Sequence, residues 1–258
     1  MQRPPDRRTP TILFTRATSE WISRVNQKHK QLTELHLSPE QTERFDRLAE
    51  TEFVYSTLRL EGEAVEEEHI ARLASGSPVG NANPESGRPA LALLESLRAV
   101  TSLARARGKA AELSADLLLR LHNLPGAAPG FRRGAGDARR RKPAPAEHLP
   151  AMIDSACQWY TAESFTELNP VEQASIVLLR LLEMQPFERA NERTALVAAS
   201  LFTLRSELPP VIITPDMHAA YSNALDEGDR MNTKPMVELI AEAVERSLSK
   251  VIEEVGRW

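Results

Sequence analysis

A short polar segment with the sequence QPFERANER occupies residues 185–193, between two strongly apolar runs. The first run is IVLLRLLEM (176–184) and the second is TALVAASLFTL (194–204). If both runs are helices, the segment ends at the N-terminus of the second one, where unpaired backbone N–H groups and the helix dipole attract anions. Arg189 and Arg193 are cations that suit a phosphate at that place. The alternative is a helix–turn–helix connection whose charges are merely solvated.

A second chemically distinctive stretch covers residues 125–146, with four Gly, four Pro, six basic residues and one Asp. Such a composition disfavours a helix and favours a hairpin or an extended loop. Its charges are typical of a solvated loop, but they also suit an acidic partner segment, nucleic-acid phosphates as a weaker choice, or the Glu-rich run 61–68 of the same chain. The candidate partner-facing cations are Arg132, Arg133, Arg139, Arg140 and Arg141.

The sequence predicts that nearly all the elements that position these residues are helices. Ser38, Pro39 and Gln41 form a helix start that predicts a helix to about residue 60, and Asn169, Pro170 and Glu172 form a second start before the first apolar run. Pro186 should end that run. The apolar spacing predicts further helices, and residues 75–89 read as a loop. The other expected helices are 89–107, one capped by Ser114, 149–162, 194–204, 216–228 and 235–255.

Composition bounds the fold and its chemistry. The chain has 258 residues, a formal net charge of −4, 41% hydrophobic residues and one cysteine. We therefore expect no internal disulfide, no multi-cysteine metal cluster and no global attraction to nucleic acid or anionic membrane. Cys157 lies in an apolar run and is interpreted as structural. With no apolar run of membrane-spanning length, a cytoplasmic protein is the expectation, with an N-terminal arm and lead-in helix (1–37) before a helical domain (38–258).

Four segments together resemble the Fic (filamentation-induced by cAMP) family. QPFERANER is similar to that family's HPFxDGNGR motif, and VYSTLRLEGEAV (54–65) resembles its inhibitory-helix motif through Thr57, Glu61 and Gly62. LHNLPGAAPGFRRG (121–134) resembles the segment before the family's β-hairpin flap, and KPAPAEHLPAMID (142–154) resembles the segment after it. The order and spacing agree over about residues 40–245. The resemblance implies an all-α, Fic-like helical bundle, to which a short β-hairpin flap near 130–145 can be added.

The resemblance also implies a reaction and roles for residues. Fic proteins usually transfer AMP from ATP, with Mg²⁺, to a hydroxyl group of a target protein, which the flap holds as an added strand. Gln185 stands where the general base should be, Pro186 and Phe187 match structural positions, and Glu61 stands where an inhibitory carboxylate should be. The implied nucleotide- and phosphate-binding positions are Arg189, Ala190, Asn191, Glu192 and Arg193.

Several of these positions carry the wrong side chain for that reaction. An amide such as Gln185 does not titrate, and none of the six histidines adjoins the segment in sequence. His122 and His148 are interpreted as core or surface residues, with approach to the segment in space as the alternative. Arg189 would repel a metal ion, Ala190 resists positive φ, and Glu192 adds negative charge. The family's second Arg is Leu196 here, so Glu61 is expected to pair with Arg189 or Arg193 instead.

Three functions remain open from the sequence. The first is a Fic-like adenylyltransferase with a degraded site, inactive or strongly impaired. The second is a non-enzymatic module that holds a peptide or partner protein in the Fic groove. The third is an atypical phosphate-group transferase that uses Arg189 and Arg193 as clamps. The residues themselves assign no metal ligand, and ATP and Mg²⁺ rest on the resemblance alone.

Overall fold

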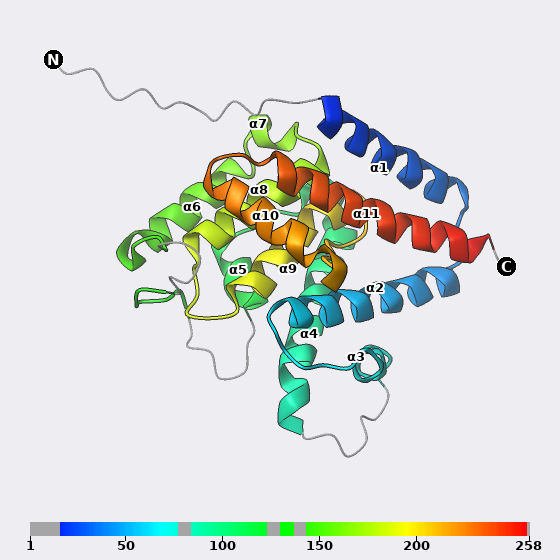
Figure 1. Cartoon of the computed structure of the whole chain (residues 1–258), viewed down its shortest axis with the longest axis horizontal. Coiled ribbons are helices and arrows are strands. Elements are labelled where there is room, and N and C mark those ends of the chain that lie inside the picture. Colours follow the sequence, from blue (N-terminus) through cyan, green and yellow to red (C-terminus); the bar gives the residue numbers. More distant parts are fainter. Residues whose placement is uncertain (1–15, 77–83, 123–129, 137–142, 257–258) are drawn as a thin grey trace.

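The computed structural model describes residues 16–76, 84–122, 130–136 and 143–256 (Figure 1). These residues form a bundle of helices, and none of them lies in a β-strand. The all-α prediction is therefore confirmed. The helices are α1 (Arg16–Glu34), α2 (Pro39–Leu60), α3 (Glu67–Ala74), α4 (Pro84–Arg107), α5 (Ala115–Leu121), α6 (Leu149–Trp159), α7 (Glu163–Thr166), α8 (Pro170–Met184), α9 (Asn191–Leu204), α10 (His218–Asp229) and α11 (Lys234–Val255).

The two predicted capping boxes fix the starts of α2 and α8. Ser38 Oγ accepts a hydrogen bond from the Gln41 N–H at 3.2 Å, while Gln41 Oε1 accepts one from the Ser38 N–H at 2.8 Å. At α8, Asn169 Oδ1 accepts from the backbone N–H two residues later, and Glu172 Oε2 accepts from the Asn169 N–H at 3.0 Å. These side chains satisfy backbone donors that the first helical turn leaves without partners, so the helices begin where local sequence directs.

Some boundaries differ from the sequence-based expectation. Helix α4 begins at Pro84, inside the segment 75–89 that composition assigned to a loop, and it continues through Pro89. Helix α9 begins at Asn191, three residues before its apolar run. Helices α3 and α7 were not predicted, because both are short and one lies in a Glu-rich run. The N-terminal arm 1–15, residues 123–129 before the expected flap and residues 137–142 within it lie outside the described residues.

Helix α9 is the centre of the bundle. It packs most extensively on α8, with α4, α5 and α2 also in contact with it (Figure 1). Small residues let those neighbours approach closely, and every residue from Arg193 to Thr203 is buried. Helix α11 lies beside α8 and α10, and α1 packs along α11. Only the first two residues of α9, Asn191 and Glu192, are partly exposed before this buried stretch. The N-terminus of the helix is therefore the end that borders the polar segment.

Among the residues that the structure describes, no helix combines the length and the apolar character that crossing a membrane requires.

Candidate functional site

The segment between α8 and α9 is a tight loop with two residues in the left-handed region. Gln185 has φ 46° and ψ 67°, and Ala190 has φ 58° and ψ 29°. Pro186 follows directly after the end of α8, as predicted. A left-handed conformation costs an ordinary residue about 1–2 kcal/mol, because Cβ crowds the following carbonyl. Ala190 therefore adopts the conformation that its side chain resists, and the surrounding contacts hold it there.

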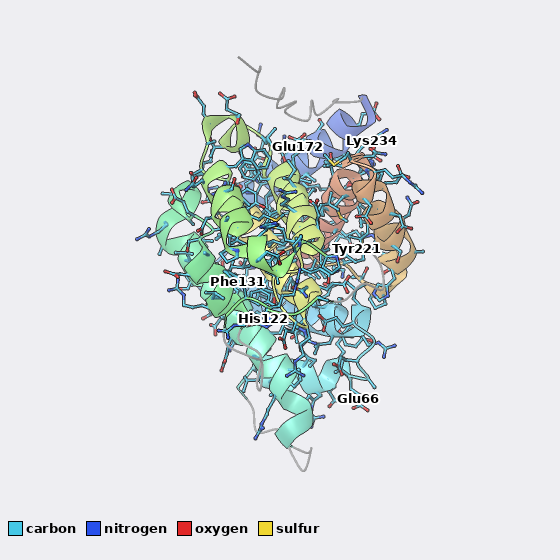
Figure 2. All side chains as sticks on the ribbon, turned by 90° about the vertical axis from the view of Figure 1, so that its left-hand side faces the viewer. Glu66, His122, Phe131, Glu172, Tyr221 and Lys234 are labelled. Atoms are coloured by element: carbon cyan, nitrogen blue, oxygen red, sulfur yellow. The ribbon has the colours of Figure 1, made fainter. Side chains whose placement is uncertain are left out.

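Asn191 closes this loop on itself. Its Oδ1 accepts a hydrogen bond from the Phe187 N–H at 2.9 Å, and its Nδ2 donates to the Phe187 carbonyl at 2.8 Å. The Phe187 ring is fully buried and stacks on the imidazole of His122, with 3.7 Å between ring centroids, and Phe131 packs on it from another side. Figure 2 shows His122 and Phe131 at the same part of the molecule. Phe187 thus anchors the loop in the core.

Arg132 holds the same loop from outside. Its Nε donates to the Gln185 carbonyl at 2.6 Å and its Nη2 to the Met184 carbonyl at 3.2 Å, while its own backbone N–H donates to the Pro186 carbonyl at 2.8 Å. The same guanidinium also donates to the carbonyls of residues 134 and 144. Burial lowers the pKa of Arg132. Arg132 is thus an internal clamp on the end of α8, not the exposed partner-facing cation that its sequence neighbourhood suggested.

Arg133 is exposed, whereas Arg139, Arg140 and Arg141 lie outside the described residues.

Arg193 forms an ion pair with Glu61. This is one of the two pairings expected for Glu61, the other being with Arg189. The guanidinium Nε donates to Glu61 Oε2 at 2.6 Å, and Nη2 donates to the same oxygen. The other carboxylate oxygen, Oε1, accepts a hydrogen bond from the Arg193 backbone N–H at 3.2 Å. Only 8% of the Arg193 side chain and 13% of the Glu61 side chain are exposed. The carboxylate therefore lies at the N-terminus of α9, on the backbone donor that an anionic ligand would use.

The end of α2 places Glu61 there. The Glu61 N–H donates to the carbonyl of Thr57, a buried residue of the last turn, and Gly62 follows with φ 84°. That left-handed angle favours glycine and turns the chain away directly after Glu61. Thr57 and Gly62, singled out with Glu61 in the sequence, thus form the helix end that aims this carboxylate at α9.

A pocket of about 460 Å³ lies beside the loop. Leu60, Leu179, Leu182 and Leu225 form its apolar side. The charged side chains that line it are six carboxylates and one guanidinium, namely Glu61, Glu183, Glu188, Glu192, Asp226, Asp229 and Arg189. Two of these carboxylates are in ion pairs, Glu61 with Arg193 and Glu183 with Arg180. The acidic groups of the lining still outnumber the basic ones, so the electrostatics oppose the anion that the helix N-terminus would attract.

Comparison with known proteins finds a family match in the part of the chain that contains this loop. The Fic/DOC family profile matches residues 112–203, which include the α8–α9 loop. Residues 112–203 are thus a Fic/DOC family region. A Fic-domain-containing signaling protein from Bacteroides thetaiotaomicron has a solved structure with a TM-score of 0.80 and 23% identity, covering 92% of this chain and 98% of that one. This likeness shows that the Fic fold is shared.

Two curated relatives are named protein adenylyltransferase fic-1. The Caenorhabditis elegans protein is 28% identical over 147 residues, which cover 55% of this chain and 29% of the relative. The Caenorhabditis briggsae protein is 32% identical over 106 residues, which cover 41% of this chain and 20% of the relative. The chain thus spans less than a third of the length of these relatives.

Within this Fic/DOC family region, His122 contacts residues near both ends of the α8–α9 loop, Phe187 and Thr194. Its Nδ1 lies 3.1 Å from Thr194 Oγ1, and its ring is buried against Phe187. Burial, and then the positive charges of Arg193 and Arg189, lower the pKa of His122 to about 4. Of the core or surface role expected for His122, the structure shows the core one, and the ring also reaches the motif segment through Phe187. At neutral pH its imidazole is uncharged. His148 is exposed.

The side chains of the α8–α9 loop do not fit Mg²⁺. The position that the family resemblance assigns to an acidic metal ligand is Arg189, a cation that lines the pocket. Among the described residues, no group of three or more His, Cys, Asp and Glu side chains is arranged to hold a metal ion.

The acidic residues Asp226 and Asp229 of α10 and the clamp role of Arg132 were missed from sequence. Local sequence carries no signal for either, because both arise from contacts between segments that are far apart in the chain.

Proposed function

We propose that this chain is a Fic-domain protein related to protein adenylyltransferases in which AMP transfer is lost or strongly reduced. The observation that carries the proposal is the Glu61–Arg193 pair. The Glu61 carboxylate accepts hydrogen bonds from both the guanidinium and the backbone N–H of Arg193 at the start of α9. A phosphate group at that helix N-terminus would have to displace a buried, charge-assisted contact before it could bind.

The proton chemistry supports the same proposal. AMP transfer forms a bond from the target hydroxyl oxygen to the α-phosphorus of ATP, breaks the bond to pyrophosphate, and needs a base for the hydroxyl proton. The Gln185 amide accepts no proton near neutral pH. His122 is buried beneath Phe187 with Nδ1 against Thr194, which leaves it unsuited to replace that base. Loss of a general base alone costs about 10²–10⁴-fold in rate.

The pocket electrostatics add to this effect. ATP would meet the six carboxylates that line the pocket, and Arg189 would have to stand in for a metal ion. Neutralisation of phosphate charge is the main catalytic contribution in phosphoryl-transfer sites, so the missing metal ligand weakens both binding and reaction.

The test is AMP transfer measured by intact mass on the protein itself and on lysate proteins. We expect no transfer by the wild type or by Glu61→Gly, which opens the Arg193 site. Transfer by the wild type that is lost in Arg193→Ala would overturn the proposal. A further variant restores His, Asp and both Gly at positions 185, 189, 190 and 192 in combination with Glu61→Gly. AMP transfer by this variant would show that only the loop has lost its chemistry, and no transfer would favour a repurposed surface.

Titration calorimetry with ATP, ADP and CTP, with and without Mg²⁺, separates this proposal from the non-enzymatic alternative. Binding of a nucleotide to Glu61→Gly and not to Glu61→Gly/Arg193→Ala supports a degraded transferase site. No nucleotide binding to any variant favours a module that only holds a partner protein in the groove beside the flap. Turnover with any nucleotide favours the atypical transferase.

A further inference from the structure

A second concavity lies away from the motif, where the ends of α1, α2 and α11 converge beside α4 (at the right in Figure 1). It is a groove of about 780 Å³ and is completed by the loop at residues 204–212. It shares no lining residue with the pocket beside the α8–α9 loop. Its volume is within the range of specific binding sites, about 300–1,000 Å³. We call it the α2–α11 groove.

The floor of the α2–α11 groove is apolar. Leu48 of α2 lines the groove, and 48% of its surface is exposed although it is a large hydrophobic residue. Phe45, one turn before it, also lines the groove and is only half-buried. The remaining apolar lining residues are Leu32, Leu37, Ala49, Ala104, Leu204, Leu208, Pro209, Pro210, Ile212 and Val251. Burying such a set is worth about 25 cal/mol per Å² of apolar surface, so a complementary apolar ligand gains free energy here.

The rim of the groove is acidic. Six carboxylates line it against three basic side chains. The basic side chains are already engaged, because Arg105 pairs with Asp46, Lys250 pairs with Glu52, and the buried Arg205 binds the Ala111 carbonyl and Gln173.

Three rim carboxylates remain available, those of Glu67, Glu207 and Glu253. Within the described part of the chain, none of them takes part in an ion pair or a side-chain hydrogen bond. Glu207 also holds a left-handed φ of 61° at the turn that closes the groove. The surface therefore combines an apolar floor with unneutralised negative charge at its edge.

We propose that the α2–α11 groove is a docking site for a basic amphipathic segment of a partner protein. Apolar side chains of that segment cover Phe45 and Leu48, and its Lys or Arg side chains lie against Glu67, Glu207 and Glu253. An amphipathic helix laid in an apolar groove is a recurrent recognition mode, and opposite charges fix its position and speed its association. The negative rim repels the phosphates of nucleic acid and of anionic membranes. This inference does not depend on the state of the motif loop.

The probe is a fluorescein-labelled peptide of about 18 residues with Leu at i, i+3, i+4 and i+7 and Lys elsewhere. Its binding to the full chain is measured by fluorescence anisotropy. We expect micromolar affinity that falls at least tenfold between about 50 and 300 mM salt, because the rim charges are exposed. A peptide with Glu in place of Lys should not bind, and a scrambled peptide without an apolar face should bind at least tenfold more weakly.

Matched variants of the protein locate the site. Leu48→Asp should weaken the probe at least tenfold, whereas Leu91→Asp, at an equally exposed leucine of α4 outside the groove, should leave its affinity unchanged. Glu253→Lys should weaken the probe several-fold, whereas Glu147→Lys at an exposed site elsewhere should not. Circular dichroism establishes that each variant is folded.

Three results would overturn the proposal. The first is equal affinity of the probe for wild type and Leu48→Asp. The second is binding of the Glu-containing peptide as tightly as the Lys-containing one. The third is a concentration-dependent dimer of the wild type that Leu48→Asp abolishes, since a second copy of the chain would then be the occupant.

Discussion

Replacing Glu61 by Ala should destabilise the protein far more than breaking an ordinary surface ion pair. Both side chains of the Glu61–Arg193 pair are about nine-tenths buried, and Arg193 Nη1 is already buried without a partner. Removing one member of a buried pair costs about 3–5 kcal/mol when the other charge is left without compensation. The half-exposed Glu63, 3.8 Å from Arg193, compensates that charge only in part, so we expect a loss at the lower end of this range. For a chain of this size, a loss of about 3 kcal/mol lowers Tm by roughly 6–12 °C.

A double-mutant cycle isolates this interaction from the other effects of each substitution. Glu61→Ala, Arg193→Ala and the double variant are compared by urea and thermal denaturation, and the double variant should lose at least 2 kcal/mol less than the two single losses together. The control is Asp46–Arg105, a pair with a similar separation of 2.6 Å but with 57% of the Arg side chain exposed. Its coupling should lie near 0–1 kcal/mol. Equal coupling energies for the two pairs would refute the burial argument.

Three further predictions follow from the same loop. Ala190→Gly should leave stability unchanged or raise it by up to about 1 kcal/mol by chemical denaturation, because relief of the left-handed strain exceeds or offsets the added flexibility of the unfolded chain; a clear loss would contradict the strain argument. The pKa of His122 is about 4 in the folded protein and 6.5 in the unfolded chain, so the free energy of unfolding should fall by about 2–3 kcal/mol as the pH falls from 6.5 to 4. Urea melts at several pH values measure this slope, and His122→Gln should flatten it. Arg132→Met should cost about 3 kcal/mol, since it leaves buried carbonyls of the loop without donors; a Tm unchanged from that of Arg133→Met, at an exposed neighbour, would argue against the clamp.

Local sequence predicted the parts of this fold that depend on nearby residues. The two capping boxes at Ser38 and Asn169 were predicted because the bonds that define them join residues two or three apart. The start of α4 was missed because Pro and Gly residues favour loops in general, while Pro also fits the first turn of a helix, as at Pro84. Composition cannot separate these two uses.

The candidate site was only partly predictable. A pairing of Glu61 with Arg189 or Arg193 was expected from two motifs and from the loss of the family's second Arg at Leu196. Which arginine it is came only from the structure, which pairs Glu61 with Arg193, 132 positions away. Arg132 shows the limit of this reasoning. It was one of several arginines in a basic stretch, and only the packing of that stretch against the end of α8 distinguishes it from Arg133.

The bonds that Asn191 and Arg132 make to the loop use backbone groups of residues 184–187. Backbone hydrogen bonds thus fix much of the loop's shape. Selection for folding therefore acts strongly on Asn191 and Arg132, whereas selection for reaction acts on other positions of the loop, so an ancestor could lose its chemistry while these two anchors kept the loop folded. In a collection of sequences that share this loop, positions 132 and 191 should vary least, and the positions facing the pocket should diverge first.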